Sequence, residues 1–166
     1  MIIITMGVSG SGKTTIGRCL ATVLGWPFYD GDDFHPQANV DKMAQGMPLT
    51  DADREPWLQA MHEHIATLIR RGENAVLTCS ALKRAYRRQI VGTLKQVHFV
   101  YLRGSFDLIQ SRLAARQGHF MPSDLLASQF DTLEEPEHAV TVDVTYTPAE
   151  IVEHIRQALA LPRGTA

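Results

Sequence analysis

Short apolar runs alternate along the chain with longer stretches in which apolar residues recur every three or four positions. The short runs are rich in β-branched residues, which favour strands. They lie at Ile2–Met6, Pro27–Tyr29, Ala75–Cys79, Val97–Leu102 and Val140–Thr145. Strands that alternate with helices predict an α/β fold, in which helices cover both faces of a parallel sheet.

The longer stretches predict amphipathic helices. Apolar residues over 16–24 and over 57–69 follow the spacing i, i+3, i+4, i+7, which places them on one face of a helix. Gly72 follows the second stretch and is suited to a helix C-terminus. Thr147-Pro148-Ala149-Glu150 combines a capping box with proline at the first helical position, so it predicts the start of a final helix.

Two polar segments, Asp30–Asp53 and Gln117–Ser123, fit neither pattern. In parallel α/β sheets, ligands bind outside the carboxyl ends of the strands, and irregular insertions at that edge are often functional. We therefore expect residues 30–58 to bind a substrate. Residues 117–123 lie between two helical patterns and are expected to form a short lid that excludes water, with an ordinary loop as the alternative.

A phosphate-binding loop follows the first predicted strand. Residues 7–14 match the pattern G-x-x-x-x-G-K-[ST] and lie between a predicted strand and a predicted helix, as the pattern requires. Glycines let backbone N–H groups surround a phosphate, and the following helix directs the positive end of its dipole at it. We expect Lys13 to bridge the β- and γ-phosphates of ATP and Thr14 to bind Mg²⁺. The expected nucleotide-binding residues are Gly7, Ser9, Gly10, Ser11, Gly12, Lys13, Thr14 and Thr15.

An acidic cluster follows the second predicted strand, in Asp30-Gly31-Asp32-Asp33. A carboxylate beyond a strand next to the P-loop strand is placed to take the proton of an acceptor hydroxyl group during phosphoryl transfer. We assign that catalytic role to Asp32. Asp30 is expected to contact Mg²⁺ indirectly, through water or a neighbouring ligand. The alternative is a cluster of Asx turns that caps the next helix.

Several cations are candidates for binding an anionic substrate. Arg54 lies in the first turn of a predicted helix, where a cation is mildly unfavourable, so a carboxylate partner would explain it. Lys83 and Arg87 are spaced i, i+4 and are expected to share a helix face. Arg116 precedes the expected lid and would stabilise charge on the transferring phosphoryl group. Solvated surface positions are the alternative for each of them.

Composition narrows the class of protein. The chain has 166 residues, 45% of them hydrophobic and 20% charged, which fits a single folded domain over residues 1–166. Its net charge of −2 argues against non-specific binding to nucleic acid or to an acidic membrane. Two cysteines cannot form a disulfide framework, and the apolar start is too short for a membrane span, so we expect a cytoplasmic protein.

The chain resembles bacterial gluconokinases of the P-loop type. The resemblance extends over nearly the whole chain and rests on five segments: Gly7–Thr14, Asp30–His35, Lys42–Leu58, Cys79–Arg87 and Gly118–Glu134. It implies a shikimate-kinase-like fold with strand order 2-3-1-4-5, and transfer of the ATP γ-phosphoryl group to the 6-hydroxyl group of D-gluconate. It also implies a homodimer. The substrate-binding residues that we expect are Asp32, His35, Arg54, Lys83, Arg87 and His119.

Two other functions remain open at this point. Another kinase of the same fold could act on shikimate or a nucleoside monophosphate, and a nucleotide-binding switch would have no acceptor substrate. Shikimate kinases carry an arginine in the middle of the lid, whereas this chain has His119-Phe120-Met121 there. The chain also lacks the N-K-x-D tetrapeptide by which GTPase switches read guanine. The acidic cluster favours a kinase, and the missing tetrapeptide argues against a GTPase switch.

Overall fold

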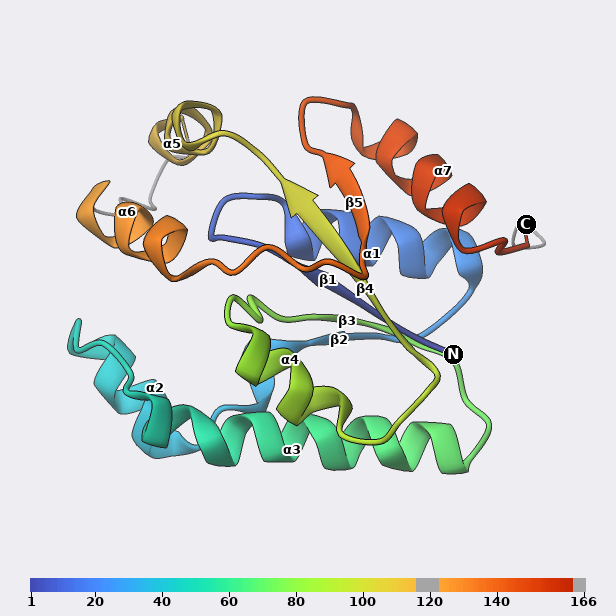
Figure 1. The fold of residues 1–166 in the computed structure, drawn as a ribbon, viewed down its shortest axis with the longest axis horizontal. Coiled ribbons are helices and arrows are strands. Elements are labelled where there is room, and N and C mark those ends of the chain that lie inside the picture. The colour runs from blue at the N-terminus through green and yellow to red at the C-terminus, as the bar shows by residue number, and fades with distance from the viewer. Residues whose placement is uncertain (116–122, 163–166) are drawn as a thin grey trace.

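A five-stranded parallel sheet organises the protein (Figure 1). The computed structural model describes residues 1–115 and 123–162. Its strands pair in the order β2-β3-β1-β4-β5, which confirms the fold that the resemblance implied. The strands are β1 (Ile2–Met6), β2 (Phe28–Asp30), β3 (Ala75–Thr78), β4 (Val97–Arg103) and β5 (Val140–Asp143).

Helices cover both faces of this sheet. In Figure 1, α1 and α7 lie on one face, and α3 and α4 lie on the other. The helices are α1 (Lys13–Leu24), α2 (Gln37–Ala44), α3 (Asp51–Arg70), α4 (Arg84–Val91), α5 (Phe106–Ala114), α6 (Ser123–Thr132) and α7 (Pro148–Ala158), with a 3₁₀ turn, η1 (Gly31–Phe34). Among the described residues, no helix is both long enough and apolar enough to cross a membrane.

The central strand β1 divides the core into two parts. Ile3 packs with Leu20 of α1 and Ile155 of α7, whereas Ile2 and Ile4 pack with Met61 of α3 on the opposite face. All six of these side chains are fully buried. Successive side chains of a strand point to opposite faces, so a continuous apolar run suits a strand covered on both sides.

The predicted helix ends are present. Thr147 and Glu150 form the expected capping box at the start of α7. Thr50 caps α3 in a second capping box, with Asp53 as its partner. Gly72 follows α3 with φ of +69°, a left-handed conformation that glycine adopts without strain.

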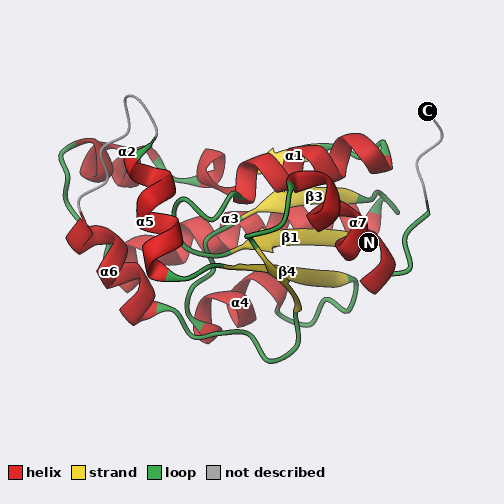
Figure 2. Cartoon of the chain, turned by 90° about the horizontal axis from the view of Figure 1, so that it is seen from above, coloured by secondary structure: helices red, strands yellow, loops and turns green. Residues whose placement is uncertain are grey.

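Helix α2 and the turn η1 were not predicted as regular structure. Both lie within the polar segment Asp30–Asp53. The apolar residues Val40 and Met43 of α2 are more than two-fifths exposed, so no buried stripe marks this helix in the sequence. In Figures 1 and 2, α2, α5 and α6 gather at the end of the sheet opposite the N-terminus. This end holds the carboxyl ends of the parallel strands, where a ligand site is expected.

Candidate active site

The loop between β1 and α1 has the backbone of a phosphate cradle. Gly7, Gly10 and Gly12 have φ values of +144°, +81° and +97°, which residues with a side chain rarely adopt. Gly12 is the N-cap of α1 and supplies no side chain to cap it. The first amides of α1 are therefore left to another acceptor, as at helix N-termini that bind anions.

Two side chains in this loop suit a phosphate ligand. The Ser11 hydroxyl group is buried and has no hydrogen-bond partner among the described residues. A buried polar group without a partner is costly, so a ligand that supplies one would be favoured. The Lys13 ammonium group folds back over the loop and donates to the Val8 carbonyl oxygen at 2.9 Å. The loop thus brings a free hydroxyl group and a cation to the N-terminus of α1, which fits the phosphates of ATP.

Neighbouring helices hold the loop in this shape. A Cβ atom at Gly10 would lie 2.8 Å from the Leu113 side chain of α5, so any other residue there would force this side chain to move. The Gln129 side chain of α6 accepts from the Ser9 amide at 2.7 Å and donates to the Ser9 hydroxyl group at 3.2 Å. The phosphate loop therefore packs against α5 and forms hydrogen bonds with α6, two helices that are distant from it in the sequence.

The structure brings Thr14 and Asp30 together. The Thr14 hydroxyl group lies 3.5 Å from one carboxylate oxygen of Asp30. The other oxygen of Asp30 accepts from the Thr78 hydroxyl group at 3.0 Å and from the Asp32 amide at 3.2 Å. The Asx-turn interpretation is therefore correct for one oxygen of Asp30, while the second faces the phosphate loop.

This pair fits a magnesium ion that a nucleotide also binds. Mg²⁺ prefers oxygen ligands and is commonly held by one or two protein groups together with substrate phosphates. Among the described residues, no group of three or more His, Cys, Asp or Glu side chains could hold a metal by itself. In such a site, Thr14 and Asp30 would be the protein ligands, and the phosphates would supply the rest.

Asp32 is the second residue of η1, the turn that carries the acidic cluster, and contacts from two sides fix this turn. The Trp57 indole N–H donates to the Gly31 carbonyl oxygen at 2.7 Å, and a Cβ atom at Gly31 would lie 2.1 Å from the Thr78 carbonyl oxygen. The pKa of Asp32 is raised, first because surrounding protein displaces water from it and then because Asp30 repels its charge; His35 and Lys13 oppose the rise. A raised pKa suits a carboxylate that must accept a proton.

His35 ends the turn that carries Asp32, and the two side chains interact electrostatically. Its ring stacks on Trp57, with the ring centres 4.2 Å apart and the planes 14° from parallel. Its Nδ1 atom lies 3.2 Å from the Asn39 side-chain nitrogen. Burial lowers the pKa of His35, and Arg54 lowers it further, while Asp32 raises it.

The Asp51 carboxylate lies next to two of the cations that were expected to bind substrate, Lys83 and Arg54. Lys83 donates to both of its oxygens at 3.0 Å, and the Tyr86 hydroxyl group donates to one of them. The Arg54 guanidinium group lies 3.7 Å from the same carboxylate and donates to the Leu49 carbonyl oxygen at 2.6 Å. Arg54 and Lys83 therefore flank one carboxylate at the start of α3, which shows that cations can bind an anion here.

Arg87 has different neighbours from Lys83. It is 7% exposed and donates to the carbonyl oxygens of Ala81 and Leu82 at 2.9 and 3.1 Å. Lys83 precedes the first residue of α4, so the helical spacing does not direct its side chain, and the two residues bind different partners. A role for Arg87 in substrate binding stays a prediction.

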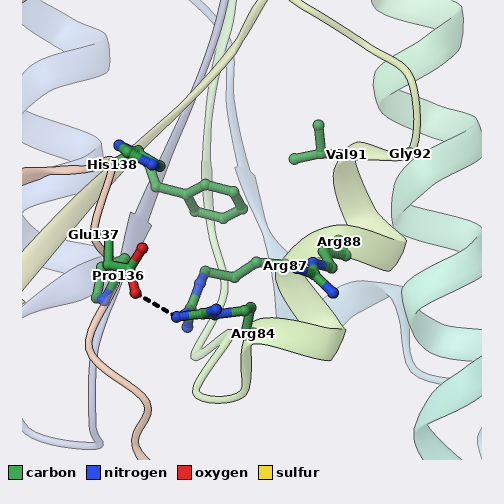
Figure 3. Close-up of a pocket in the computed structure, with 9 residues that line it drawn as sticks. Arg84, Arg87, Arg88, Val91, Gly92, Pro136, Glu137 and His138 are labelled. Carbon is green, nitrogen blue, oxygen red and sulfur yellow. Dashed lines mark hydrogen bonds and ion pairs between the residues drawn. The ribbon is translucent and has the colours of Figure 1, made fainter.

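Arg87 also lines a pocket of about 380 Å³ that runs along α4 (Figure 3). Arg84 and Arg88 line it from the same helix, and Glu137 and His138 lie on the opposite side. Arg84 and Glu137 form an ion pair across this pocket. Two further site predictions, Arg116 and His119, lie outside the described residues, as does nearly all of the expected lid.

Comparisons with known proteins agree with this geometry. The sequence model of an AAA domain matches residues 2–136. The chain is 53% identical to the gluconokinase of Gluconobacter oxydans over 81% of its length and 75% of that protein. It is 44% identical to the thermosensitive gluconokinase of Escherichia coli, over 94% of this chain and 86% of that one. A crystal structure of a gluconokinase from Sinorhizobium meliloti superposes with a TM-score of 0.86 at 46% identity, covering 95% of this chain and 90% of that one. The chain belongs to the gluconokinase family.

Several residues around this gluconokinase-family site were not predicted to act there. Asn39 contacts His35, four positions away, and the other four have a partner far along the chain: Asp51, Thr78, Tyr86 and Gln129. The sequence patterns gave neither Asp51 nor Gln129 a role in the site. In each case the polar side chain was visible in the sequence, but its partner is set by the fold.

The Asp53 carboxylate supports a prediction about stability. Hydrogen bonds, first from Lys42 and then from Thr50, lower the pKa of Asp53 to about 2. A lowered folded-state pKa stabilises the protein above the unfolded pKa of about 3.9. We therefore expect this stabilisation to be lost as the pH falls from about 4 to about 2. Asp53→Asn should lower the midpoint of thermal unfolding by a few degrees at pH 7 and reduce its dependence on pH in the acid range.

A matched control is Asp107→Asn, which changes an exposed aspartate in the first turn of α5. Asp107 forms no ion pair with any described residue, so its loss should shift the midpoint much less. Equal shifts for the two variants at pH 7 would contradict the assignment.

Proposed function

We propose that the protein transfers the γ-phosphoryl group of ATP to the 6-hydroxyl group of D-gluconate. The observation that carries the proposal is the 3.5 Å contact between Thr14 and Asp30, because it joins the phosphate loop to the acidic turn. A nucleotide on the loop and an acceptor beside Asp32 would therefore share one site. Relatives named gluconokinase, at up to 53% identity, support gluconate over shikimate or a nucleoside monophosphate as the acceptor.

The phosphate loop binds and orients ATP in this proposal. Its amides and the Ser11 hydroxyl group would hold the phosphates, and the Lys13 ammonium group would neutralise charge that develops during transfer. Thr14 and Asp30 would hold Mg²⁺, which supplies charge neutralisation at the phosphate oxygens when bound. Thr15 lies in the first turn of α1 and belongs to the same proposed set.

Asp32 acts as the base in the proposed transfer. A bond forms between the gluconate 6-oxygen and the γ-phosphorus atom, while the bond from this phosphorus to the bridging oxygen of ADP breaks. The proton of the hydroxyl group passes to the Asp32 carboxylate. Its raised pKa makes Asp32 a better proton acceptor than an ordinary surface carboxylate.

The carboxylate of gluconate is bound by cations at the start of α3 and α4 in this proposal. Arg54 and Lys83 already flank one carboxylate, that of Asp51. His35 would bind hydroxyl groups of the sugar acid. Arg87 and His119 complete the proposed set, although Arg87 uses one nitrogen to bind backbone carbonyl oxygens and His119 lies outside the described residues.

An assay of ADP release tests the proposed function. Purified protein is given ATP and Mg²⁺ with gluconate, shikimate, AMP or no acceptor. We expect fast ADP release with gluconate and a rate near background with the other three. Equal rates with and without gluconate would overturn the proposal, since they would indicate an ATPase or a switch.

Arg54→Ala tests the sugar-acid end of the site. Removing a cation that binds the carboxylate before and during transfer should raise the KM for gluconate by about tenfold or more, with a small effect on kcat. Arg88→Ala, at an exposed position of α4, is the control and should leave the KM unchanged. A normal KM in Arg54→Ala would return Arg54 to the role of bracing the Leu49 carbonyl oxygen.

We also propose a single cytoplasmic domain that acts as a homodimer, without nucleic-acid or membrane partners. The net charge of −2 and the single sheet of the described residues support the domain and its lack of polyanionic partners. The homodimer rests on the resemblance to gluconokinases. Light scattering during size-exclusion chromatography tests it, and a monomer mass at micromolar concentration would contradict it.

A further inference from the structure

The Asn39 side chain joins the predicted substrate-binding histidine to helix α3. Asn39 is 3% exposed and belongs to α2, the helix that lies beside the start of α3 in Figure 1. Its Nδ2 atom donates to the Asp53 carbonyl oxygen at 2.7 Å and lies 3.2 Å from Nδ1 of His35. One amide nitrogen thus contacts both partners.

These two contacts determine which nitrogen of His35 carries the proton. A backbone carbonyl oxygen only accepts hydrogen bonds, so the Asp53 carbonyl oxygen must face the NH₂ end of the Asn39 amide. The second hydrogen of that NH₂ group is then available to His35. Because an amide NH₂ group only donates, Nδ1 of His35 must accept, and the ring proton lies on Nε2.

Stacking on Trp57 also fixes the ring. The Trp57 indole stacks on the ring and holds its plane. Trp57 is itself held in place, because it is 4% exposed and donates a hydrogen bond to the Gly31 carbonyl oxygen. Nε2 of His35 has no hydrogen-bond partner within residues 1–115 and 123–162. The ring is therefore held on one edge, and its N–H on the other edge is left for a ligand.

We propose that Asn39 is a positioning residue that holds His35 as the neutral Nε2–H tautomer, so that His35 presents a hydrogen-bond donor to a hydroxyl group of the sugar acid. The proposal rests on the proposed function for the identity of the ligand. A neutral donor suits a hydroxyl group, whereas the neighbouring cations Arg54 and Lys83 suit a carboxylate.

The charges around His35 are consistent with a neutral ring. Asp32 of η1 and Arg54 of α3 act on it with opposite signs. The Asp53 carboxylate is directed to Lys42 and Thr50, and only the Asp53 backbone reaches Asn39. Burial disfavours the imidazolium form in addition.

Nitrogen-15 NMR of the histidine rings tests the tautomer directly. The seven histidines are labelled, and the His35 signals are assigned by their loss in His35→Gln. In the unaltered protein at pH 7, we expect an unprotonated Nδ1 and a protonated Nε2. Asn39→Asp replaces the donor with an acceptor, so Nδ1 should become protonated. Gln45→Glu, the same chemical change at an exposed residue next to α2, should leave the His35 signals unchanged.

A pair of substitutions at His35 covers the case in which Asn39→Asp fails to fold. The side-chain nitrogen of glutamine reaches the position of Nε2, and that of asparagine the position of Nδ1. We expect His35→Asn to raise the KM for gluconate about tenfold more than His35→Gln, the effect of one lost hydrogen bond.

A protonated Nδ1 in the unaltered protein would overturn the proposal, as would equal KM values for the two His35 variants. The NMR result does not depend on turnover. If gluconate proves not to be a substrate, the proposed function fails while the tautomer assignment can still stand.

Discussion

Lys13→Ala is expected to lower kcat by about 10²-fold or more, because the ammonium group neutralises charge that grows on the phosphoryl group during transfer. The group already lies over the phosphate loop, bonded to the Val8 carbonyl oxygen. Rates of ADP formation at saturating ATP and gluconate measure the effect. Lys95→Ala, at an exposed lysine outside the site, is the control and should keep a normal kcat.

The fold of Lys13→Ala must be checked because its side chain also braces the loop. A midpoint of thermal unfolding close to that of the unaltered protein would show that the loss is catalytic. A kcat within about threefold of normal would remove Lys13 from the transfer step, since a lost charge contact at the transition state costs far more.

Asp32→Asn is expected to lower kcat by about 10²-fold or more with little change in the KM for gluconate. Asparagine keeps the shape and polarity of the side chain but cannot take the proton of the acceptor hydroxyl group. The neighbouring Asp33→Asn is a matched control and should retain most of the activity. Near-normal turnover in Asp32→Asn would move the role of base to another residue.

The dependence of activity on pH gives a second test of Asp32. A base must be deprotonated to act, so kcat/KM should fall as the pH drops through the pKa of Asp32. Because that pKa is raised by loss of water and by Asp30, the fall should occur above the ordinary range of an aspartate. Asp32→Asn should lose this fall along with most of its activity.

Local patterns in the sequence predicted the sheet and the phosphate loop. The apolar run Ile2–Ile4 was sufficient to predict β1, because every side chain is buried in a strand that is covered on both faces. The phosphate loop is also local, since its chemistry depends on contiguous backbone. Helix α2 was missed because its exposed apolar residues leave no periodic stripe.

Contacts between distant residues could not be predicted in this way. Asp51 and Tyr86 are 35 positions apart, and Ser9 and Gln129 are 120 positions apart, so only the folded topology places them together. Arg87 illustrates the reverse problem. Its charge suggested a substrate anion, whereas the structure also gives it two backbone carbonyl oxygens as partners.

Phosphorus NMR of the reaction mixture tests the central proposal most directly. The protein is incubated with ATP, Mg²⁺ and D-gluconate, and the spectrum is recorded with coupling to protons. Transfer to the 6-hydroxyl group creates a phosphate ester on a CH₂ group, so we predict a new signal split into a triplet, together with the signals of ADP. A doublet would place the phosphate on a secondary hydroxyl group, and inorganic phosphate alone would show that water is the acceptor. Either result would contradict the proposed reaction.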